Sequence, residues 1–164
     1  MLVLGIDPGI AITGYAFLAS DAQGEPKLIE YGVIDLTAVK ENSGRLLLLF
    51  DKLDELILKH QPSAAAIEKL FFQKNVKTAM AVSEGRGVVQ YCLARHGLPV
   101  REFTPNEVKL AVTSSGSADK RQVQEMVRIL LNLEQVPSPD DAADAIAIAL
   151  CALGTFNYES LMQG

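Results

Sequence analysis

Four acidic residues, spread over almost the whole chain, stand where apolar segments have no structural use for a charge. Asp7 closes one apolar run near the amino terminus and Glu68 closes a second, whereas Asp141 and Asp144 lie among alanines and isoleucines. Buried carboxylates without basic partners are costly, and a bound divalent cation is the usual remedy. This set of oxygen ligands predicts a metal-dependent phosphoryl-transfer site.

The expected cofactor is a pair of Mg²⁺ ions. Two carboxylates about 4 Å apart repel each other by roughly 4 kcal/mol at an effective dielectric of 20, so cations are needed to hold the group together. Two ions about 4 Å apart would satisfy the ligands, activate a water and stabilise a departing oxygen. Hard oxygen ligands favour Mg²⁺, with Mn²⁺ as a substitute, over zinc.

Some of the acids also have a structural explanation. Asp7 could cap the turn at Pro8-Gly9, and Asp140 and Asp141 stand in the first turn of a helix, where acids suit the helix dipole. That explanation does not extend to Asp144, which lies a turn further on. Both Asp140 and Asp141 have helical spacing to Asp144, so spacing alone leaves open which of the two joins it.

The elements that position these residues follow from apolar periodicity and turn signals. Strands are expected at 2–7, 12–19, 27–35, 64–68 and 99–103. Helices are expected at 44–59, at 75–96, from Thr104 onward, from a Ser117 cap to Leu131, and from Ser138 onward. The order predicts an α/β fold, in which an antiparallel three-strand meander plus parallel strands form a mixed sheet flanked by helices. We expect one domain over 1–154 and a frayed tail over 155–164.

This arrangement predicts a common pocket. Strands 2–7 and 64–68 could lie side by side, which would put Asp7 and Glu68 at the carboxyl edge of the sheet, where open α/β sheets bind ligands. Docking the last helix over the strand ends would add its carboxylates.

Composition points to a cytoplasmic globular protein. The chain has 164 residues, 49% apolar and 21% charged, without a run of about 20 apolar residues or the flanks of a signal peptide. We therefore expect no membrane partner. Cys92 and Cys151 are interpreted as core residues without metal-ligand spacing, and His60 and His96 as helix-end residues without a catalytic role.

The net charge of −5 is unevenly distributed. Residues 69–128 hold ten Lys and Arg against five acids, a net charge of +5, so the rest of the chain carries −10. A basic middle is compatible with a nucleic-acid partner, although solvated helix faces explain the same pattern.

Four segments together carry a family resemblance. They are Gly5-Ile6-Asp7-Pro8-Gly9 with Thr13-Gly14, Ile67-Glu68 with Phe71-Phe72, Gly116-Ser117-Ala118-Asp119-Lys120, and Asp141-Ala142-Ala143-Asp144-Ala145. In this order, over residues 1 to about 154, the chain resembles the RuvC family of bacterial Holliday-junction resolvases. The resemblance implies a ribonuclease-H-like fold and Mg²⁺-dependent, paired nicking of four-way DNA junctions in recombination and repair. It also implies a homodimer and a branch-migration motor complex as partner.

Carried over residue by residue, the resemblance assigns roles. The catalytic metal ligands fall on Asp7, Glu68, Asp141 and Asp144, which selects Asp141 over Asp140. Lys120 and Lys109 match positions that contact or stabilise the scissile phosphate, although solvated helix surface is the alternative for both.

DNA contacts are expected from the segment that follows Glu68. By the resemblance, Phe71 stacks on bases, and Lys74 would add a cation to the same loop. The alternative is that one of Phe71 and Phe72 belongs to the core.

The helix expected at 75–96 is the candidate dimer surface. Apolar and small residues cover more than one of its faces, more than packing against a single sheet requires. Gly85 and Gly87 would permit close approach of a partner, at a helix-propensity cost of roughly 1 kcal/mol each. The alternative is a helix buried within one subunit.

Three other functions compete with junction cleavage. The first is a monomeric ribonuclease-H-like nuclease of ribosomal-RNA maturation. The second is a nucleotide-binding domain of the actin and sugar-kinase type, which would need a second, similar half. The third is a junction-binding protein without catalysis, which the intact acidic residues argue against.

Overall fold

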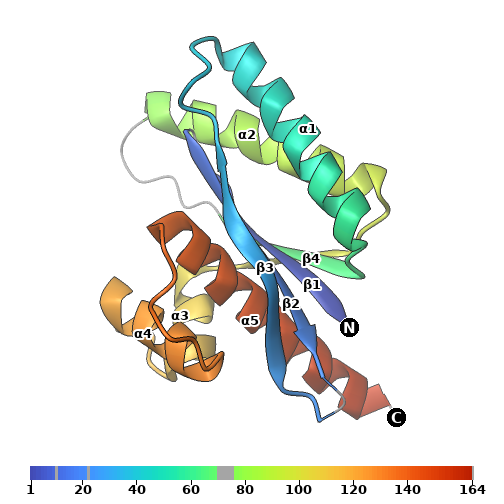
Figure 1. Cartoon of the computed structure of the whole chain (residues 1–164), viewed down its shortest axis with the longest axis vertical. Helices are drawn as coiled ribbons and strands as arrows, with labels where there is room; N and C mark the ends of the chain where they lie inside the picture. The colour runs from blue at the N-terminus through green and yellow to red at the C-terminus, as the bar shows by residue number, and fades with distance from the viewer. Residues whose placement is uncertain (10, 22, 70–75, 164) are drawn as a thin grey trace.

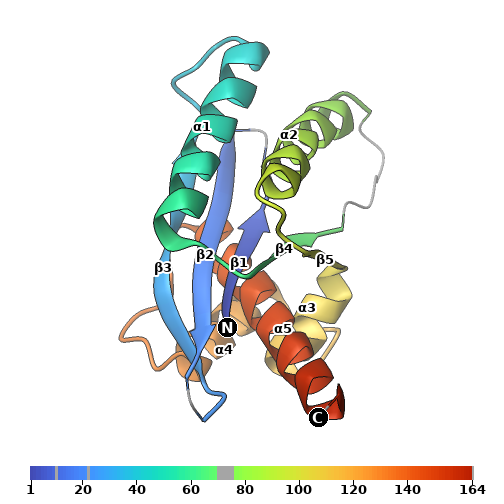
Figure 2. The same ribbon diagram turned by 90° about the vertical axis from the view of Figure 1, so that its right-hand side faces the viewer.

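A five-stranded mixed sheet forms the centre of the computed structural model, with strand order β3-β2-β1-β4-β5 (Figures 1 and 2). The strands are β1 (Leu2–Asp7), β2 (Ile12–Ser20), β3 (Pro26–Asp35), β4 (Ala64–Glu68) and β5 (Val100–Phe103). The first three pair as an antiparallel meander, and β4 and β5 extend the sheet in parallel to β1. The predicted mixed sheet is therefore confirmed. The structure describes residues 1–9, 11–21, 23–69 and 76–163.

Helices cover both faces of the sheet. They are α1 (Asn42–His60), α2 (Val76–Arg95), α3 (Pro105–Thr113), α4 (Lys120–Leu130) and α5 (Asp140–Gln163). In Figure 1, α1 and α2 lie on one side of the sheet, and α3, α4 and α5 lie on the other. In the described part of the chain, no helix combines the length and the apolarity needed to cross a membrane.

Capping explains where the helices of the second layer begin. Thr104 starts α3 as predicted, since its hydroxyl accepts the backbone N–H of Glu107 in a capping box. The predicted Ser117 cap of α4 is wrong, because Asp119 occupies the cap and accepts the backbone N–H of Gln122. Asp119 has the extended backbone that a cap residue needs directly before the first helical turn.

Side-chain alternation along the strands divides the core into two layers. Leu4 is buried in the layer under α1 and α2, whereas its neighbour Val3 is buried in the layer under α5. Because successive strand residues point to opposite faces, Asp7 shares the α5 face with Val3. In β4, Ala66 belongs to the α5 layer, so Glu68 two residues later also faces α5. The fold thus directs both strand-end acids toward the same helix.

The last helix continues past residue 154 to Gln163. Arg101 of β5 donates from Nη2 to both carboxylate oxygens of Glu159 at 2.5 and 2.7 Å. Its guanidinium carbon also lies 5.8 Å from the centre of the Phe156 ring. These contacts connect the end of α5 to the sheet. The division into a nuclease domain over 1–154 and a frayed tail over 155–164 stays a prediction.

Candidate active site at the carboxyl edge of the sheet

Asp7 and Glu68 end two neighbouring parallel strands. Ile6 of β1 is in register with Ile67 of β4, so the acids that follow them leave the sheet side by side. The expectation that strands 2–7 and 64–68 share this edge is confirmed.

Glycines let α5 lie directly on the strands that carry these acids. A methyl group at Gly14, which pairs with Asp7 across β1 and β2, would overlap the main-chain carbonyl oxygen of Asp141. A methyl group at Gly5 would likewise overlap the carbonyl oxygen of Ala145. Main-chain contact of this kind is possible only where the strand has no side chain. The two glycines therefore bring the first turns of α5 down to the strand ends.

Burial and mutual repulsion perturb the protonation of this group. The pKa of Asp7 is raised to about 7, first because the carboxyl is buried and then because Asp144, Glu68 and Asp141 are negatively charged neighbours. Burial and the charge of Asp144 also raise the pKa of Glu68. The pKa of Asp144 is raised chiefly by burial, against the opposing effect of Lys120. These couplings identify Asp7, Glu68, Asp141 and Asp144 as one electrostatic site.

A small cleft of about 190 Å³ opens beside the carboxylates. Glu68, Asp144, Lys109 and Lys120 all line it, so the structure brings both predicted lysines to the acidic site. The Lys120 ammonium lies 3.1 Å from carboxylate oxygens of both Asp140 and Asp144. Positive charge at the mouth of an acidic cleft is the arrangement that a phosphate group requires.

The structure separates the roles of Asp140 and Asp141. Asp140 is exposed and accepts a hydrogen bond of 3.0 Å from the side-chain amide of Gln124. A hydrogen bond from Lys120, and then this one from Gln124, hold the pKa of Asp140 below its usual value. Asp141 instead acts electrostatically on Asp7. The assignment of Asp141 as a metal ligand stays a prediction.

Arg86 of α2 is part of the site's surroundings and was not singled out from the sequence, where it counted only as charge. Its Nη1 donates a hydrogen bond to the main-chain carbonyl oxygen of Glu68, and its Nη2 lies 2.7 Å from Glu102. Its side chain is only 11% exposed, and its charge opposes the rise in the pKa of Glu68. Arg86 therefore fixes the end of β4 from the opposite layer.

The donor set of the acidic site fits hard divalent cations. All four side chains offer carboxylate oxygens, and burial together with charged neighbours raises the pKa values of Asp7, Glu68 and Asp144, an effect that bound cations would oppose. Among the described residues, the group whose three ligand atoms all lie within 4.8 Å of one another is a different one, Asp54, Cys92 and His96.

Two predicted DNA contacts, Phe71 and Lys74, lie outside the described residues.

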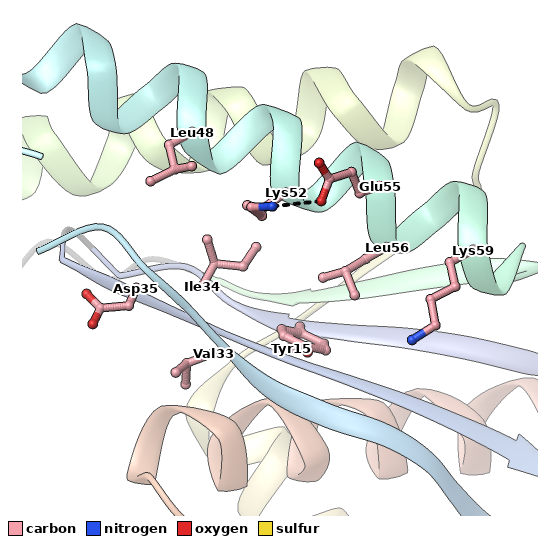
Figure 3. Close-up of a pocket in the computed structure, with 9 residues that line it drawn as sticks. All are labelled: Tyr15, Val33, Ile34, Asp35, Leu48, Lys52, Glu55, Leu56 and Lys59. Atoms are coloured by element: carbon pink, nitrogen blue, oxygen red, sulfur yellow. Dashed lines mark hydrogen bonds and ion pairs between the residues drawn. The ribbon is translucent and has the colours of Figure 1, made fainter. Parts of the chain in front are cut away.

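A separate cleft of about 500 Å³ lies between α1 and the β2–β3 side of the sheet, lined in part by Tyr15, Lys52 and Glu55 (Figure 3). It contains none of the predicted site residues, so its larger volume does not make it the candidate active site.

Comparison with known proteins decides the family. A model described as "Crossover junction endodeoxyribonuclease RuvC" matches residues 3–152. The chain belongs to the RuvC family. A RuvC protein of Alkaliphilus metalliredigens is 47% identical over 163 residues, with 99% of each chain covered. A RuvC protein of Roseiflexus sp. is 49% identical over 148 residues, which cover 90% of this chain and 88% of the relative.

Solved RuvC structures agree with the fold. Thermus thermophilus RuvC matches with a TM-score of 0.87 and 32% identity, covering 96% of this chain and 97% of the other. The complex of T. thermophilus RuvC with a Holliday junction substrate matches with a TM-score of 0.86 and 30% identity, covering 96% of each chain. The predicted ribonuclease-H-like fold and the prediction of a nuclease are confirmed. The alternative of a ribosomal-RNA maturation nuclease is not favoured by these RuvC matches.

Proposed function

We propose that this chain resolves four-way (Holliday) DNA junctions by paired, symmetric nicks that leave 5′-phosphate and 3′-hydroxyl ends. The observation that carries the proposal is the convergence of carboxylates from β1, β4 and α5 on one edge of the sheet, in a chain of the RuvC family. The T. thermophilus relative is described in complex with a Holliday junction substrate. Recombination and repair in the cytoplasm, together with a branch-migration motor, are the proposed setting.

Asp7, Glu68, Asp141 and Asp144 are the proposed ligands of two Mg²⁺ ions, which Mn²⁺ could replace. When bound, the ions supply activation of a water and stabilisation of charge on the departing oxygen. The protein's own contribution is to hold the four carboxylates together in a site where burial, and then repulsion from the neighbouring acids, raises the pKa of Asp7 to about 7, so that it is partly protonated at neutral pH without cations.

Lys120 and Lys109 are the proposed phosphate contacts. Both line the cleft with Glu68 and Asp144, and an ammonium group there offsets the charge that develops on a phosphodiester under attack. Lys120 is also a proposed catalytic residue, since it lies against Asp144. Phe71 and Lys74 are proposed to contact DNA on the strength of the family resemblance.

A cleavage assay tests the function. The purified protein would be incubated with a synthetic four-way junction, a matched duplex and single strands, in Mg²⁺ and then in chelator. We expect symmetric nicks on the junction alone, only with Mg²⁺, and a loss of at least 10²-fold in Asp7→Asn. The control Asp140→Asn removes an equivalent charge one residue before Asp141 and is expected to cleave within a few-fold of wild type. Full activity in Asp7→Asn, or nicking in chelator, would contradict the proposal.

The proposed homodimer forms through α2 and the adjoining surface of α1. Leu47, Met80 and Tyr91 are 62%, 62% and 60% exposed there, an unusual degree for three large apolar side chains on one surface. Gly87 faces open space, so a partner helix could approach it, whereas Gly85 is buried near Leu49 inside the subunit. A two-fold axis at this surface would present two active sites to equivalent strands.

Sedimentation of matched variants tests the dimer. Tyr91→Glu puts a charge into the proposed interface, and Ile129→Glu puts one on an α4 side chain that is 54% exposed in the other helix layer. We expect wild type and Ile129→Glu to sediment at twice the subunit mass and Tyr91→Glu at the mass of one subunit. Monomeric wild type, or dimeric Tyr91→Glu, would refute this interface.

A further inference from the structure

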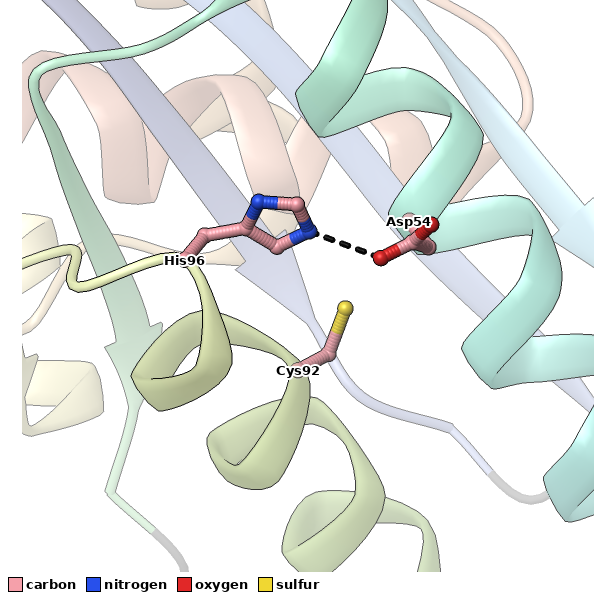
Figure 4. Close-up of side chains that lie close together, drawn as sticks. All are labelled: Asp54, Cys92 and His96. Carbon is pink, nitrogen blue, oxygen red and sulfur yellow. Dashed lines mark hydrogen bonds and ion pairs between the residues drawn. The ribbon is translucent and has the colours of Figure 1, made fainter.

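A second cluster of ligand-type side chains lies between α1 and α2, in the helix layer opposite α5. Asp54 comes from α1, Cys92 from α2, and His96 from the turn that directly follows α2 (Figure 4). The carboxylate oxygen, the sulfur and the ring nitrogen all lie within 4.8 Å of one another. In Figure 4 the thiol of Cys92 points toward the gap between the other two side chains.

The local structure explains this convergence. The backbone N–H of His96 donates to the carbonyl oxygen of Cys92 at 3.3 Å, so the helical spacing of four residues continues through His96. Residues at this spacing share one face of a helix. That face packs against α1, where His96 Nε2 lies 2.7 Å from Asp54 Oδ1. A thiol, an imidazole and a carboxylate therefore meet at a single point between two helices.

We propose that Asp54, Cys92 and His96 form a binding site for a thiophilic transition-metal ion of the Zn²⁺ class, separate from the acidic site. Thiolate and imidazole are the donors that Zn²⁺ prefers over Mg²⁺, and a carboxylate is an accepted third ligand. A water would take the fourth position of a tetrahedral ion. The donor chemistry of the two sites is thus different enough to keep their metals apart.

The spacing fits an ion after a small adjustment. Bonds of about 2.0 to 2.3 Å place tetrahedral ligands roughly 3.3 to 3.8 Å from one another. The sulfur, which lies within 4.8 Å of both other donor atoms, would have to approach them by up to about 1.5 Å, and the 2.7 Å contact between His96 and Asp54 must open by about 1 Å or less. Both side chains are partly exposed, His96 at 18% and Asp54 at 27%, so they have room to move and water can reach the site.

Metal binding at this site would require Cys92 to lose its thiol proton. Burial and the nearby Asp54 carboxylate raise the pKa of Cys92 to about 11, so without an ion the side chain is a neutral thiol. Binding would release the thiol proton to solvent, while the imidazole keeps one proton on the nitrogen that does not face the ion. The ion would then hold the end of α2 to α1.

Cobalt substitution tests the site on the full-length protein. After treatment with chelator, and with excess Mg²⁺ to occupy the acidic site, Co²⁺ is expected to give a sulfur-to-cobalt charge-transfer absorption band that saturates at one equivalent per chain. Cys151→Ser provides the matched control, because it removes the other buried thiol and leaves the cluster intact. We expect the band in wild type, in Cys151→Ser and in Asp7→Asn, and its loss in Cys92→Ser.

A second variant covers the case in which Cys92→Ser does not fold. Asp54→Asn keeps the shape of the side chain and is expected to raise the dissociation constant for Co²⁺ at least tenfold. Zn²⁺ should raise the melting temperature of wild type and of Cys151→Ser much more than that of Asp54→Asn. Absence of the band in wild type, its persistence in Cys92→Ser, or its dependence on Cys151 would overturn the proposal.

Discussion

Asp7→Asn is expected to stabilise the metal-free protein above neutral pH while leaving its stability almost unchanged near pH 4. The pKa of Asp7 is about 7 in the folded protein and 3.8 in an unperturbed chain. The folded state therefore binds more protons than the unfolded state between these values, and the free energy of unfolding falls as the pH rises through that interval. Above pH 7 the contribution from protonated Asp7 is lost.

The size of the effect follows from the two pKa values. A difference of about three between them corresponds to about 4 kcal/mol at 1.36 kcal/mol per unit of pKa. Asparagine keeps the shape of the carboxyl and has no charge to repel Asp144 or Glu68, so the variant avoids this loss. Glu68 and Asp144 leave a residual slope in the variant, because burial raises their pKa values as well. We expect a gain of about 2 to 4 kcal/mol at pH 8.

Urea unfolding followed by circular dichroism, in chelator and at several pH values from 4 to 8.5, measures the difference between the two proteins. Asp140→Asn is the control, since the pKa of Asp140 is lowered by Lys120 and Gln124 and its removal should give no gain at pH 8. Saturating Mg²⁺ should restore stability to wild type and little to Asp7→Asn. If wild type and Asp7→Asn keep a constant difference across this pH range, the buried, repelled carboxylate inferred from the structure does not exist.

Three further variants test the surroundings of the site. Gly14→Ala should destabilise the fold by about 1 to 3 kcal/mol in urea unfolding, because its methyl group would overlap the Asp141 carbonyl oxygen. In the control Gly154→Ala the methyl group meets open space, so this variant should be neutral or stabilising. Lys120→Met should lower the single-turnover cleavage rate by about 10² to 10³-fold, while its affinity for the junction stays within a few-fold of wild type. Equal losses in cleavage rate and in affinity would argue that Lys120 only binds DNA. Arg86→Lys cannot make both contacts of the guanidinium, so it should cleave more slowly than the control Arg95→Lys even where the two variants have similar melting temperatures. An unchanged cleavage rate in Arg86→Lys would show that Arg86 does not position Glu68.

The sequence predicted the elements well because their signals are local. The strands 2–7 and 64–68 were predicted with the bounds that the structure has, since each is an apolar run that ends at an acid. The capping box that begins at Thr104 was also correct. The cap of α4 was wrong because Ser117 and Asp119 are both good cap residues, and the choice depends on the backbone path of the preceding turn.

Features that depend on contacts between distant residues were harder to predict. The Cys92–His96 spacing is visible in the sequence, but the third donor, Asp54, lies 38 residues before Cys92 on another helix. Cys92 is a buried core residue, as predicted, and the proposed metal site would give it a second role, because the fold brings two further ligand types to its sulfur. The role of Arg86 cannot be recognised in the sequence for the same reason, since this residue of α2 bonds to the backbone of β4.

The start of α5, which carries Asp140, Asp141 and Asp144, shows how core composition can position a candidate site. Helical spacing accepts either of the first two acids, and the structure places the main-chain carbonyl oxygens of Asp141 and Ala145 against Gly14 and Gly5. Alanines on that side of the helix, including Ala145, complete a contact without large side chains. A helix seated on strand backbone in this way has little freedom to rotate or lift, because the packed surfaces leave no space between them. The small residues that look like ordinary core in the sequence are therefore what holds the carboxylates of α5 at the strand ends.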